Sequence, residues 1–325
     1  MHRNFLVTGG CGFIGSAFIR KMLDRADFFG KIINFDALTY AANPRSLQAV
    51  ERDWRYRFVQ GDINDFSLVE SVCQKEHIDA IVHFAAETHV DRSIESALPF
   101  IEANVKGTML LLEVIRRHRH IRFHHVSTDE VYGALGKEGE FSEQSPYRPN
   151  SPYSASKAAA DHLVRAYIQT YGIYATISHC SNNYGPFQHP EKFIPRLLTC
   201  CIEGKPIPIY GRGDNVRDWL YVDDHVEAIW QILDKGKPGE TYDIGGGEEL
   251  SNLNLAHTLI DALAQHTGCH REQYLQLIHF VDDRPGHDFR YAIDFSKISR
   301  DLGWTPSIDL QSGLQKTVSL FSCLH

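Results

Sequence analysis

The sequence lacks both the long apolar runs of a membrane-spanning protein and the positive charge of a nucleic-acid-binding one. No stretch approaches the roughly 18 consecutive apolar residues that a membrane span requires. Lysine and arginine number 33 against 41 aspartates and glutamates, which gives a net charge of −8 at pH 7. We therefore expect no membrane and no nucleic acid among the partners of this protein.

Paired cysteines and a secretory signal are missing too. The seven cysteines are scattered, odd in number and free of any C-x-x-C pair, which suits a reducing compartment. The first residues, Met1–Asn4, run directly into an apolar strand instead of a signal sequence. These features predict a cytoplasmic location.

Histidine, by contrast, is abundant. Of the 18 histidines, four lie within 118–125, so a metal site has to be considered. His118 and His120 belong to the basic end of a predicted helix, whereas His124 and His125 are neighbours in a predicted strand and point to opposite faces. Such neighbours cannot chelate one ion together, so we predict no metal and interpret these histidines as surface and packing residues.

Short β-branched or aromatic segments alternate with helical patterns through the first half of the chain. The predicted strands are Phe5–Thr8, Ile32–Phe35, Tyr56–Gln60, Ala80–Phe84 and Arg122–Ser127. The predicted helices are Ile14–Asp24, Ser67–Glu76, Phe100–Arg117 and Ser154–Tyr171. This alternation predicts an α/β fold with a Rossmann-type doubly wound parallel sheet. Beyond about Tyr174, repeated prolines interrupt shorter segments, which predicts a smaller, irregular C-terminal substrate lobe.

A glycine-rich turn follows the first predicted strand and contains Gly9, Gly12 and Gly15. Glycines let the backbone reach positive φ and bring amide groups up to a pyrophosphate, which the N-terminus of the next helix also favours. Asp36 follows the second predicted strand, 21 residues after Gly15, where a carboxylate can hydrogen-bond the adenosine ribose. Because this charge would repel a 2′-phosphate, the predicted cofactor is NAD rather than NADP.

Tyr153 and Lys157 lie one helical turn apart and share a face. A nearby ammonium stabilises a phenolate, so we expect Lys157 to lower the pKa of Tyr153 and make it a base for a substrate hydroxyl. The fifth predicted strand leads into Thr128, Asp129 and Glu130, whose two acids offer one proton donor and one acceptor. Taken alone, these patterns also occur on solvated helix faces and turns; the dinucleotide pattern upstream favours the catalytic interpretation.

These residues belong to longer motifs that together resemble the extended short-chain dehydrogenases, and among them the family of dTDP-glucose 4,6-dehydratases, over nearly the whole chain. The motifs are TGGCGFIG at 8–15, DALTYA at 36–41, GDI at 61–63, HFAAETHVDRS at 83–93, STDEVYG at 127–133, PYSASKA at 152–158, SNNYGP at 181–186, PEKFIP at 190–195, PIYGRGDNVRDWLYVDDH at 208–225 and DRPGHD at 283–288.

The resemblance implies a redox-neutral dehydration of a nucleotide-diphosphohexose, with dTDP-glucose favoured. Tyr153, supported by Lys157 and Thr128, would take the carbon 4 hydroxyl proton as hydride passes to NAD. Glu130 would then remove the carbon 5 proton while Asp129 protonates the departing carbon 6 hydroxyl. Return of the hydride to carbon 6 would give a 4-keto-6-deoxy sugar.

The resemblance also implies two sets of binding residues. Those expected to hold NAD, besides Tyr153 and Lys157, are Gly9, Gly12, Phe13, Ile14, Gly15, Asp36, Leu38, Thr39, Asp62, Ile63, Ala85, Ala86 and Asn183. Those expected to contact substrate are Thr88, Thr128, Asn182, Lys192, Pro208, Ile209, Tyr210, Arg217, Asn252, Arg284 and His287. Arg217 and Arg284 are the forked cations that suit a diphosphate. The run Gly247–Ser251 departs from the family's pattern before Asn252.

The same resemblance predicts how the chain is divided and how it assembles. Residues 1–178, with a returning segment at about 219–245, are expected to form the NAD-binding Rossmann domain, and residues 179–218 and 246–325 the nucleotide-sugar-binding lobe. A homodimer is expected through the two helices at Phe100–Arg117 and Ser154–Tyr171.

Four alternative functions remain open at this point. A UDP- or GDP-hexose 4,6-dehydratase would use the same chemistry, and thymine differs from uracil by one methyl group, worth about 1–3 kcal/mol in a pocket. A carbon 4 epimerase or a nucleotide-sugar decarboxylase shares the fold, but an epimerase needs no acid pair and decarboxylases resemble a Ser-Glu version. A non-catalytic NAD-binding sensor is disfavoured because both Tyr153 and Lys157 are present.

Overall fold

The β-branched segments of the first half form one seven-stranded sheet whose described pairings are all parallel. The computed structural model describes residues 3–324. The strand order is β10-β6-β5-β4-β1-β2-β3. The strands are β1 (Phe5–Thr8), β2 (Ile32–Asp36), β3 (Tyr56–Gln60), β4 (Ala80–His83), β5 (Arg122–Thr128), β6 (Ala175–Cys180) and β10 (Thr241–Ile244). The predicted doubly wound α/β fold is confirmed.

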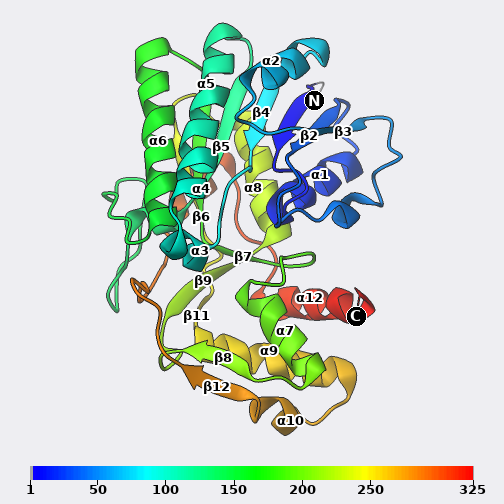
Figure 1. Ribbon diagram of the computed structural model, residues 1–325, viewed down its shortest axis with the longest axis vertical. Helices are drawn as coiled ribbons and strands as arrows, with labels where there is room; N and C mark the ends of the chain where they lie inside the picture. Colours follow the sequence, from blue (N-terminus) through cyan, green and yellow to red (C-terminus); the bar gives the residue numbers. More distant parts are fainter. Residues whose placement is uncertain (1–2, 325) are drawn as a thin grey trace.

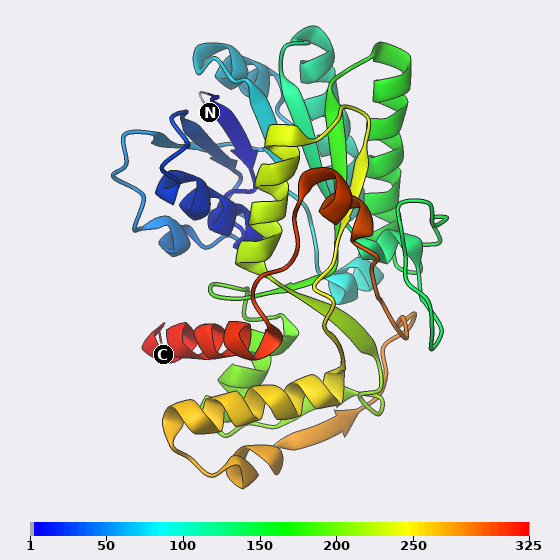
Figure 2. The ribbon, with the colours of Figure 1, turned by 180° about the vertical axis from the view of Figure 1, so that it is seen from behind.

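Helices cover both faces of this sheet, because side chains alternate along each strand (Figures 1 and 2). Phe5 and Val7 of β1 pack into the apolar cluster under α1 (Phe13–Asp24) and α8 (Val222–Lys235). Leu6 packs into the opposite cluster instead. That cluster lies under α2 (Phe66–Lys75), α5 (Thr108–Arg117) and α6 (Pro152–Tyr171).

The strand order places the site. From β1 the chain builds outward through β2 and β3, then returns to add β4, β5 and β6 on the other side of β1. In such sheets ligands bind outside the carboxyl ends of the strands, at the point where the order reverses. The shorter elements near this edge are η1 (Pro44–Leu47), α3 (Val90–Glu95), α4 (Leu98–Phe100) and the 3-10 turn η3 (Asp129–Tyr132).

The helix predicted over 100–117 is not a single regular α-helix. A π-helical stretch, η2 (Ile101–Gly107), separates α4 from α5. Within it the Asn104 side chain bonds to backbone and side-chain groups outside the helix. Insertions of this kind are frequent at functional sites, and the apolar spacing of the segment carries no sign of one.

The second lobe is more regular than its prolines predict. It carries two small sheets, ordered β11-β9-β7 and β12-β8, with helices around them (Figure 1). Its elements are β7 (Asn182–Tyr184), α7 (Phe193–Glu203), β8 (Ile207–Tyr210), β9 (Val216–Tyr221), β11 (Glu249–Ser251), α9 (Asn252–Thr267), α10 (Arg271–Leu275), β12 (Ile278–Val281) and α12 (Leu310–Leu324).

One element of the predicted lobe lies elsewhere. Helix α11 (Ser296–Leu302), assigned from the sequence to the smaller lobe, packs against β10 and α8. Ile298 and Leu302 share an apolar cluster with Tyr242 of β10, so this helix extends the large lobe (Figure 2). Separately, no helix within residues 3–324 is long and apolar enough to cross a membrane.

Candidate active site

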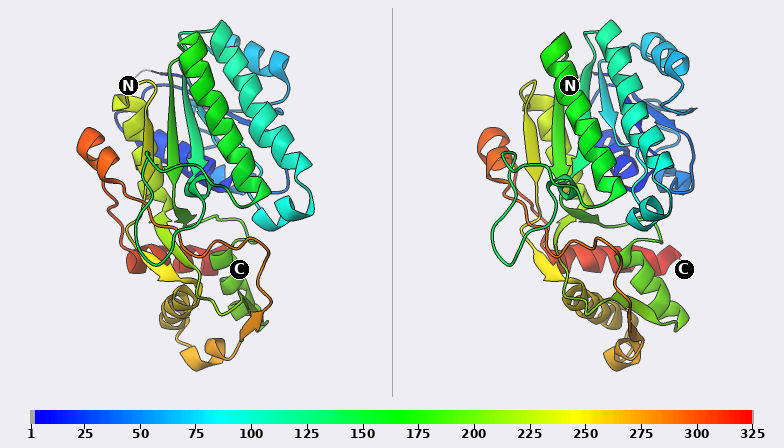
Figure 3. Two further views of the ribbon diagram at one scale, coloured as in Figure 1. Left: turned by 90° about the vertical axis from the view of Figure 1, so that its left-hand side faces the viewer. Right: turned by 60° about the vertical axis from the view of Figure 1, so that its left-hand side comes forward.

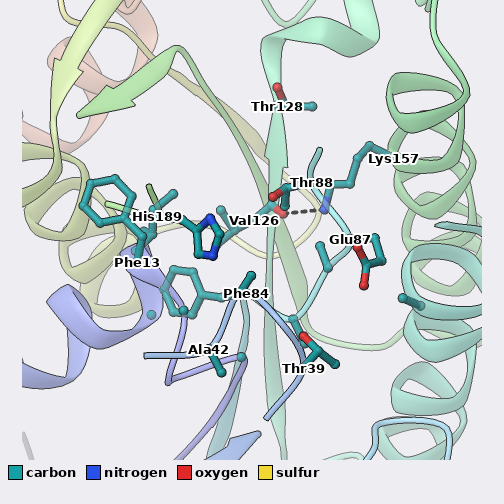
Figure 4. A pocket seen from close by; sticks show the side chains of 18 of the residues that line it. Phe13, Thr39, Ala42, Phe84, Glu87, Thr88, Val126, Thr128, Lys157 and His189 are labelled. Atoms are coloured by element: carbon teal, nitrogen blue, oxygen red, sulfur yellow. Dashed lines mark hydrogen bonds between the residues drawn. The ribbon is translucent and has the colours of Figure 1, made fainter. Parts of the chain in front are cut away.

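A cavity of about 530 Å3 opens at the carboxyl edge of the parallel sheet (Figure 4). Most of the residues predicted from the sequence line it, although they come from segments far apart in the chain. These are Gly9, Gly12, Phe13, Ile14, Gly15, Asp36, Thr39, Asp62, Ile63, Ala85, Ala86, Thr88, Thr128, Asp129, Glu130, Tyr153, Lys157, Asn182, Asn183 and Lys192.

The glycine-rich turn has the shape that a pyrophosphate requires. Gly9 has φ +71°, and a Cβ there would lie 2.5 Å from the backbone nitrogen of Ala85. A Cβ on Gly15 would collide with the carbonyl of Gly9. Gly12 caps α1 with no side-chain hydrogen bond, so the first amides of the helix keep free donors. These residues therefore fit the dinucleotide predicted for them.

Asp36 ties the turn to the end of β2. Its Oδ2 accepts a 2.8 Å hydrogen bond from the amide of Cys11, and its Oδ1 accepts one of 2.8 Å from the amide of Leu38. Burial raises the pKa of Asp36, and these two hydrogen bonds oppose the shift. The carboxylate lines the cavity with lone pairs left for ribose hydroxyls. Leu38 itself, predicted to contact NAD, does not line the cavity.

The first turns of α6 bring the phenol and the ammonium to the end of β5. Ser151 caps α6 with a reciprocal capping box and Pro152 begins it, which fixes the direction in which Tyr153 leaves the helix. Lys157 is buried and donates a 2.8 Å hydrogen bond from Nζ to the carbonyl of Val126, drawn in Figure 4. Tyr153 and Thr128 share a side-chain hydrogen bond.

The pKa of Tyr153 runs opposite to the sequence-based expectation. Burial raises it well above its ordinary value, the charges of Glu130, Cys180 and Asp129 raise it further, and only the Thr128 hydrogen bond lowers it. Lys157 is not among the groups that lower the pKa of Tyr153, and burial lowers the pKa of the Lys157 amine itself. In the protein alone the phenol is therefore protonated, and the prediction that Lys157 lowers its pKa was wrong for this state.

The two neighbouring acids occupy different electrostatic environments. Asp129 is 2% exposed, and burial and the charges of Glu130 and Asp218 raise its pKa well above its usual range. Burial also raises the pKa of Glu130, but three cations oppose that shift. These cations are Arg284, Arg217 and Lys192. Environments that separate two carboxyl groups in this way suit one as acid and the other as base.

The cations around Glu130 are held by the backbone. Lys192 donates 3.0 Å from Nζ to the carbonyl of Thr88, which closes one wall of the cavity. Arg217 is 5% exposed and donates to the carbonyls of Val216 and Asp288 at 2.8 and 3.0 Å. Arg284 lies 3.6 Å from Asp91 across the two lobes. Neither Arg217 nor Arg284 lines the cavity, but both contribute positive charge to it.

Asn183 is fixed before any ligand binds. Its Oδ1 lies 2.8 Å from Nδ1 of His225, whose pKa burial lowers to about 3, so that neutral ring donates the bond. Its Nδ2 donates 3.0 Å to the carbonyl of Ser181. The amide can therefore meet a cofactor only in one orientation.

The remaining predicted substrate residues lie in the smaller lobe and do not line this cavity. Pro208–Tyr210 belong to β8, and the Tyr210 ring lies 6.1 Å from that of His287. Asn252 begins α9, and its backbone N–H donates a 2.9 Å hydrogen bond to the carbonyl of Asn215. The departing run 247–251 ends in β11, which pairs with β9 beside Arg217, and Glu249 of β11 binds Arg290 at 2.6 Å.

Sequence reasoning missed a group of residues around Glu87. Glu87 lines the cavity, and burial raises its pKa. The side-chain oxygen of Asn104 accepts a 2.8 Å hydrogen bond from the backbone amide of Glu87, and its Nδ2 donates one of 3.0 Å to the Glu87 carbonyl. The same Nδ2 donates 2.8 Å to Ser156 of α6. Glu87 lies inside a recognised motif and could have been found. Asn104 could not, because only the π-helical turn brings it there.

Comparisons with known proteins agree with this geometry. The sequence model of a family described as GDP-mannose 4,6 dehydratase matches residues 6–317. A dTDP-glucose 4,6-dehydratase of Haemophilus influenzae is 49% identical, over 98% of this chain and 97% of its own. A solved dTDP-glucose 4,6-dehydratase of Streptomyces venezuelae, with NAD and a second ligand bound, is 47% identical with a TM-score of 0.91, over 98% of this chain and 97% of that one.

The fold alone does not separate the possible reactions. A UDP-glucuronic acid 4-epimerase of Bacillus cereus, solved with UDP-glucuronic acid and NAD, superposes with a TM-score of 0.89 at 30% identity, over 99% of this chain and all of that one (100%). The choice between dehydration and epimerisation therefore depends on the side chains that line the cavity.

Proposed function

The chain belongs to the GDP-mannose 4,6-dehydratase family within the extended short-chain dehydrogenases, and from that premise we propose that it dehydrates dTDP-glucose to dTDP-4-keto-6-deoxyglucose with NAD as cofactor. The enzyme is thus a hydro-lyase. The observation that carries the proposal is the divided acid pair: Asp129 is buried with one oxygen lacking a hydrogen-bond partner and has one cation, Arg217, acting on it, while three cations act on Glu130.

NAD, when bound, would supply the acceptor for the hydride of carbon 4 and the donor of the hydride to carbon 6. Its place is the turn Gly9–Gly15 and the carboxylate of Asp36. The residues that we propose to hold it are those named from the resemblance. Among them, Leu38 does not line the cavity; it contributes through the hydrogen bond that its backbone amide donates to Asp36.

Tyr153 and Lys157 carry the first proton transfer. As carbon 4 is oxidised, the hydroxyl proton passes to the oxygen of Tyr153, for which the phenol must first be ionised. A positive charge brought next to this buried phenol would favour the ionised form. Lys157, held by Val126, supplies one such charge at a fixed place. Thr128 supports the same oxygen by its hydrogen bond.

Asp129 and Glu130 then remove water. The new ketone acidifies carbon 5, and we assign removal of that proton to Glu130, whose pKa burial raises while three nearby cations oppose the shift. Asp129, kept protonated by burial, gives its proton to the leaving carbon 6 hydroxyl. Glu130 returns a proton to carbon 5 as carbon 6 is reduced, and the proton gained by Tyr153 balances the one lost by Asp129.

We propose that residues 179–218 and 246–295, with α12, bind the nucleotide diphosphate. Arg217 and Arg284 supply charge for the two phosphates, and the face carrying Tyr210 and His287 is the place for the base. The substrate is a nucleotide sugar; thymine as the base is the finer part of this proposal. The cytoplasmic location stays a prediction from the sequence.

A homodimer is also proposed, through α5 and α6. These helices pack side by side on one outer face of the sheet (Figure 3). Leu98 and Ile101, at the start of the same helical segment, are 67% and 46% exposed, which supports an apolar contact there. Light scattering during size-exclusion chromatography tests it: a mass near 37 kDa, that of one chain, would contradict the proposal.

The activity is tested by incubating the purified protein with dTDP-glucose and NAD and measuring the product by mass spectrometry. Loss of one water without net formation of NADH is the expected result. Unchanged mass with inverted stereochemistry at carbon 4 would indicate an epimerase, and an unchanged sugar would indicate a binding protein. UDP-glucose and GDP-mannose, assayed side by side, test the choice of base.

A further inference from the structure

A buried ionic cluster that the reaction steps do not use lies behind the catalytic residues. Asp161 of α6, His179 of β6 and Asp243 of β10 are each 0% exposed. His179 lies between the two carboxylates, with Nε2 3.1 Å from Asp161 Oδ2 and Nδ1 2.9 Å from Asp243 Oδ1. One imidazole therefore joins two carboxylates that belong to different elements.

Two tyrosines complete the cluster symmetrically. Tyr147 donates its hydroxyl proton to Asp161 Oδ2 at 3.0 Å, and Tyr132 donates its own to Asp243 Oδ1 at 2.9 Å. Each hydroxyl also lies 2.8 Å from the nearer ring nitrogen of His179. With both carboxylates accepting, the ring can donate from both nitrogens only as an imidazolium.

The charges agree with this geometry. Burial lowers the pKa of His179, but the hydrogen bonds to Asp161 and Asp243 and their charges outweigh it and raise the pKa to about 9. Burial raises the pKa of Asp161, but the hydrogen bond with His179 and the ring of His125, 3.2 Å from Asp161 Oδ1, bring it below its usual range. Buried ion pairs often contribute little net stability because desolvation is costly. Stability alone is therefore a weak reason for this cluster.

The cluster holds the catalytic segment at both ends. Ser127, directly before Thr128, donates 2.9 Å from Oγ to Asp161 Oδ2. Tyr132, the last residue of η3, binds Asp243. Asp129 and Glu130 lie between these two anchors. Asp161 follows Lys157 by one turn of α6. The same cluster therefore also ties the segment with Asp129 and Glu130 to the helix that carries Tyr153.

We propose that His179 is a positioning residue: it joins Asp161 to Asp243 and so holds the Asp129–Glu130 segment in register with Tyr153 and Lys157 on α6. The proposal rests on the proposed function. Tyr153 and Lys157 are placed by the cap of α6 and by Val126, independently of His179. Loss of His179 should therefore disturb water elimination more than oxidation at carbon 4.

The bridge should also depend on pH. His179 is held by proton donation from both nitrogens, so the bridge is intact below about pH 9 and is lost as the pH rises through that value. Four other charged or titratable groups lie around the cluster and act on it electrostatically. They are His125 of β5, Glu143 beside Asp243, Arg165 beside Tyr147, and Lys157.

The test compares His179→Gln with His124→Gln. His124 is also 0% exposed and lies on β5, but its ring contacts Thr176 and Ser178 of β6, at 2.9 and 3.2 Å, instead of Asp161 or Asp243. Rapid mixing with dTDP-glucose follows NADH absorbance for oxidation and quenched mass spectrometry for elimination. Misplacement by about 1 Å can cost about 100-fold, so elimination in His179→Gln should fall 10-fold to 100-fold while oxidation falls less than about 3-fold.

His124→Gln should leave both steps within about 2-fold of the wild type, because the His124 ring bonds Thr176 and Ser178 and does not link Asp161 to Asp243, so the placement of the reacting groups is kept. Equal losses of both steps in His179→Gln, or a profile like that of His124→Gln, would overturn the proposal. If His179→Gln does not fold, Tyr132→Phe, which removes one anchor and keeps the imidazolium, should show the same split at smaller size. Unchanged steps in that variant would overturn it.

His179→Arg supplies a cation that does not titrate in this range. If the bridge matters through its charge, this variant should restore elimination relative to His179→Gln and keep it at pH values above 9. Failure to exceed His179→Gln at any pH would count against the bridge. A wild-type enzyme that leaves dTDP-glucose intact overturns the proposed function, whereas an active wild type with an unaffected His179→Gln overturns only the positioning role.

Discussion

Lys157 donates its 2.8 Å hydrogen bond to the carbonyl of Val126, two residues before Thr128. The bond joins the catalytic helix α6 to the strand that carries the acid pair. It also aims a buried ammonium at the end of β5, where burial lowers the pKa of that amine while Asp161 and Cys180 raise it. The ammonium is thus both an anchor and a charge.

Lys157→Met is expected to remove the charge and keep most of the packing volume. General acid–base groups contribute about 100-fold to 10,000-fold, so kcat should fall within that range, with KM for dTDP-glucose changing little. Steady-state kinetics measures both. Lys205→Met is the matched control, because Lys205 is exposed at the end of α7 and pairs only with Glu203. Equal effects of both substitutions would contradict the role of Lys157.

Asp129→Asn is expected to slow water elimination more than oxidation at carbon 4. The amide keeps the shape and the hydrogen bond to Thr128 but has no acidic proton for the leaving hydroxyl. A 4-keto intermediate should therefore accumulate together with NADH, which absorbance and rapid-quench mass spectrometry can follow. If oxidation and elimination slow to the same extent, Asp129 is not the acid that acts on the leaving group.

The same substitution should stabilise the fold. The pKa of Asp129 is raised in the folded state, so this group lowers the free energy of unfolding when the pH is above its unfolded pKa. The loss of stability is absent below the unfolded value of about 3.9 and grows as the pH rises toward the folded value. Asparagine carries no such penalty. Thermal unfolding at several pH values should show Asp129→Asn above the wild type at pH 7 and the gap closing near pH 4. A gap that is constant with pH would mean that the effect is only one of packing.

The sequence predicted the large lobe well because its information is local. The glycine at Gly9 predicts a tight turn and the continuous apolar run of β1 predicts a buried strand, and the structure has both. The smaller lobe and α11 were harder, because Ile298 and Leu302 look the same on either lobe and only tertiary packing decides between them.

The site was predictable as residue types but not as electrostatics. The Y-x-x-x-K spacing put Tyr153 and Lys157 on one face, yet the pKa of the phenol depends on burial and on Glu130, which lies far away in the chain. His179 has no motif at all. Its meaning comes from two carboxylates more than a dozen residues away on either side of it, which only the sheet brings together.

Asp36 should control both the affinity for NAD and the rejection of NADP. Asp36→Ala removes the acceptor for the amides of Cys11 and Leu38 as well as the charge that would repel a 2′-phosphate. The Kd for NAD should rise about 10-fold or more, since hydrogen bonds to charged groups are worth about 1.5–3 kcal/mol. The ratio of the NADP and NAD dissociation constants should fall, as measured by calorimetry. Asp214→Ala, on an exposed turn beside Arg212, is the control and should change neither.

The raised pKa of His179 makes a prediction about stability that does not depend on catalysis. The unfolded value is about 6.5 and the folded value about 9, so the stabilisation is complete below pH 6.5 and is lost as the pH rises through 9. Urea unfolding between pH 6 and pH 10 should show this loss in the wild type. In His179→Arg the free energy of unfolding should rise relative to that of the wild type as the pH rises, because its cation persists.

The control is His124→Gln. Burial lowers the pKa of His124 to about 3, so this residue is neutral in both states over most of this range, and His124→Gln should follow the wild-type slope above pH 7. Parallel curves for His179→Arg and the wild type would mean that His179 is neutral, and the two carboxylates would then be held by the tyrosines alone.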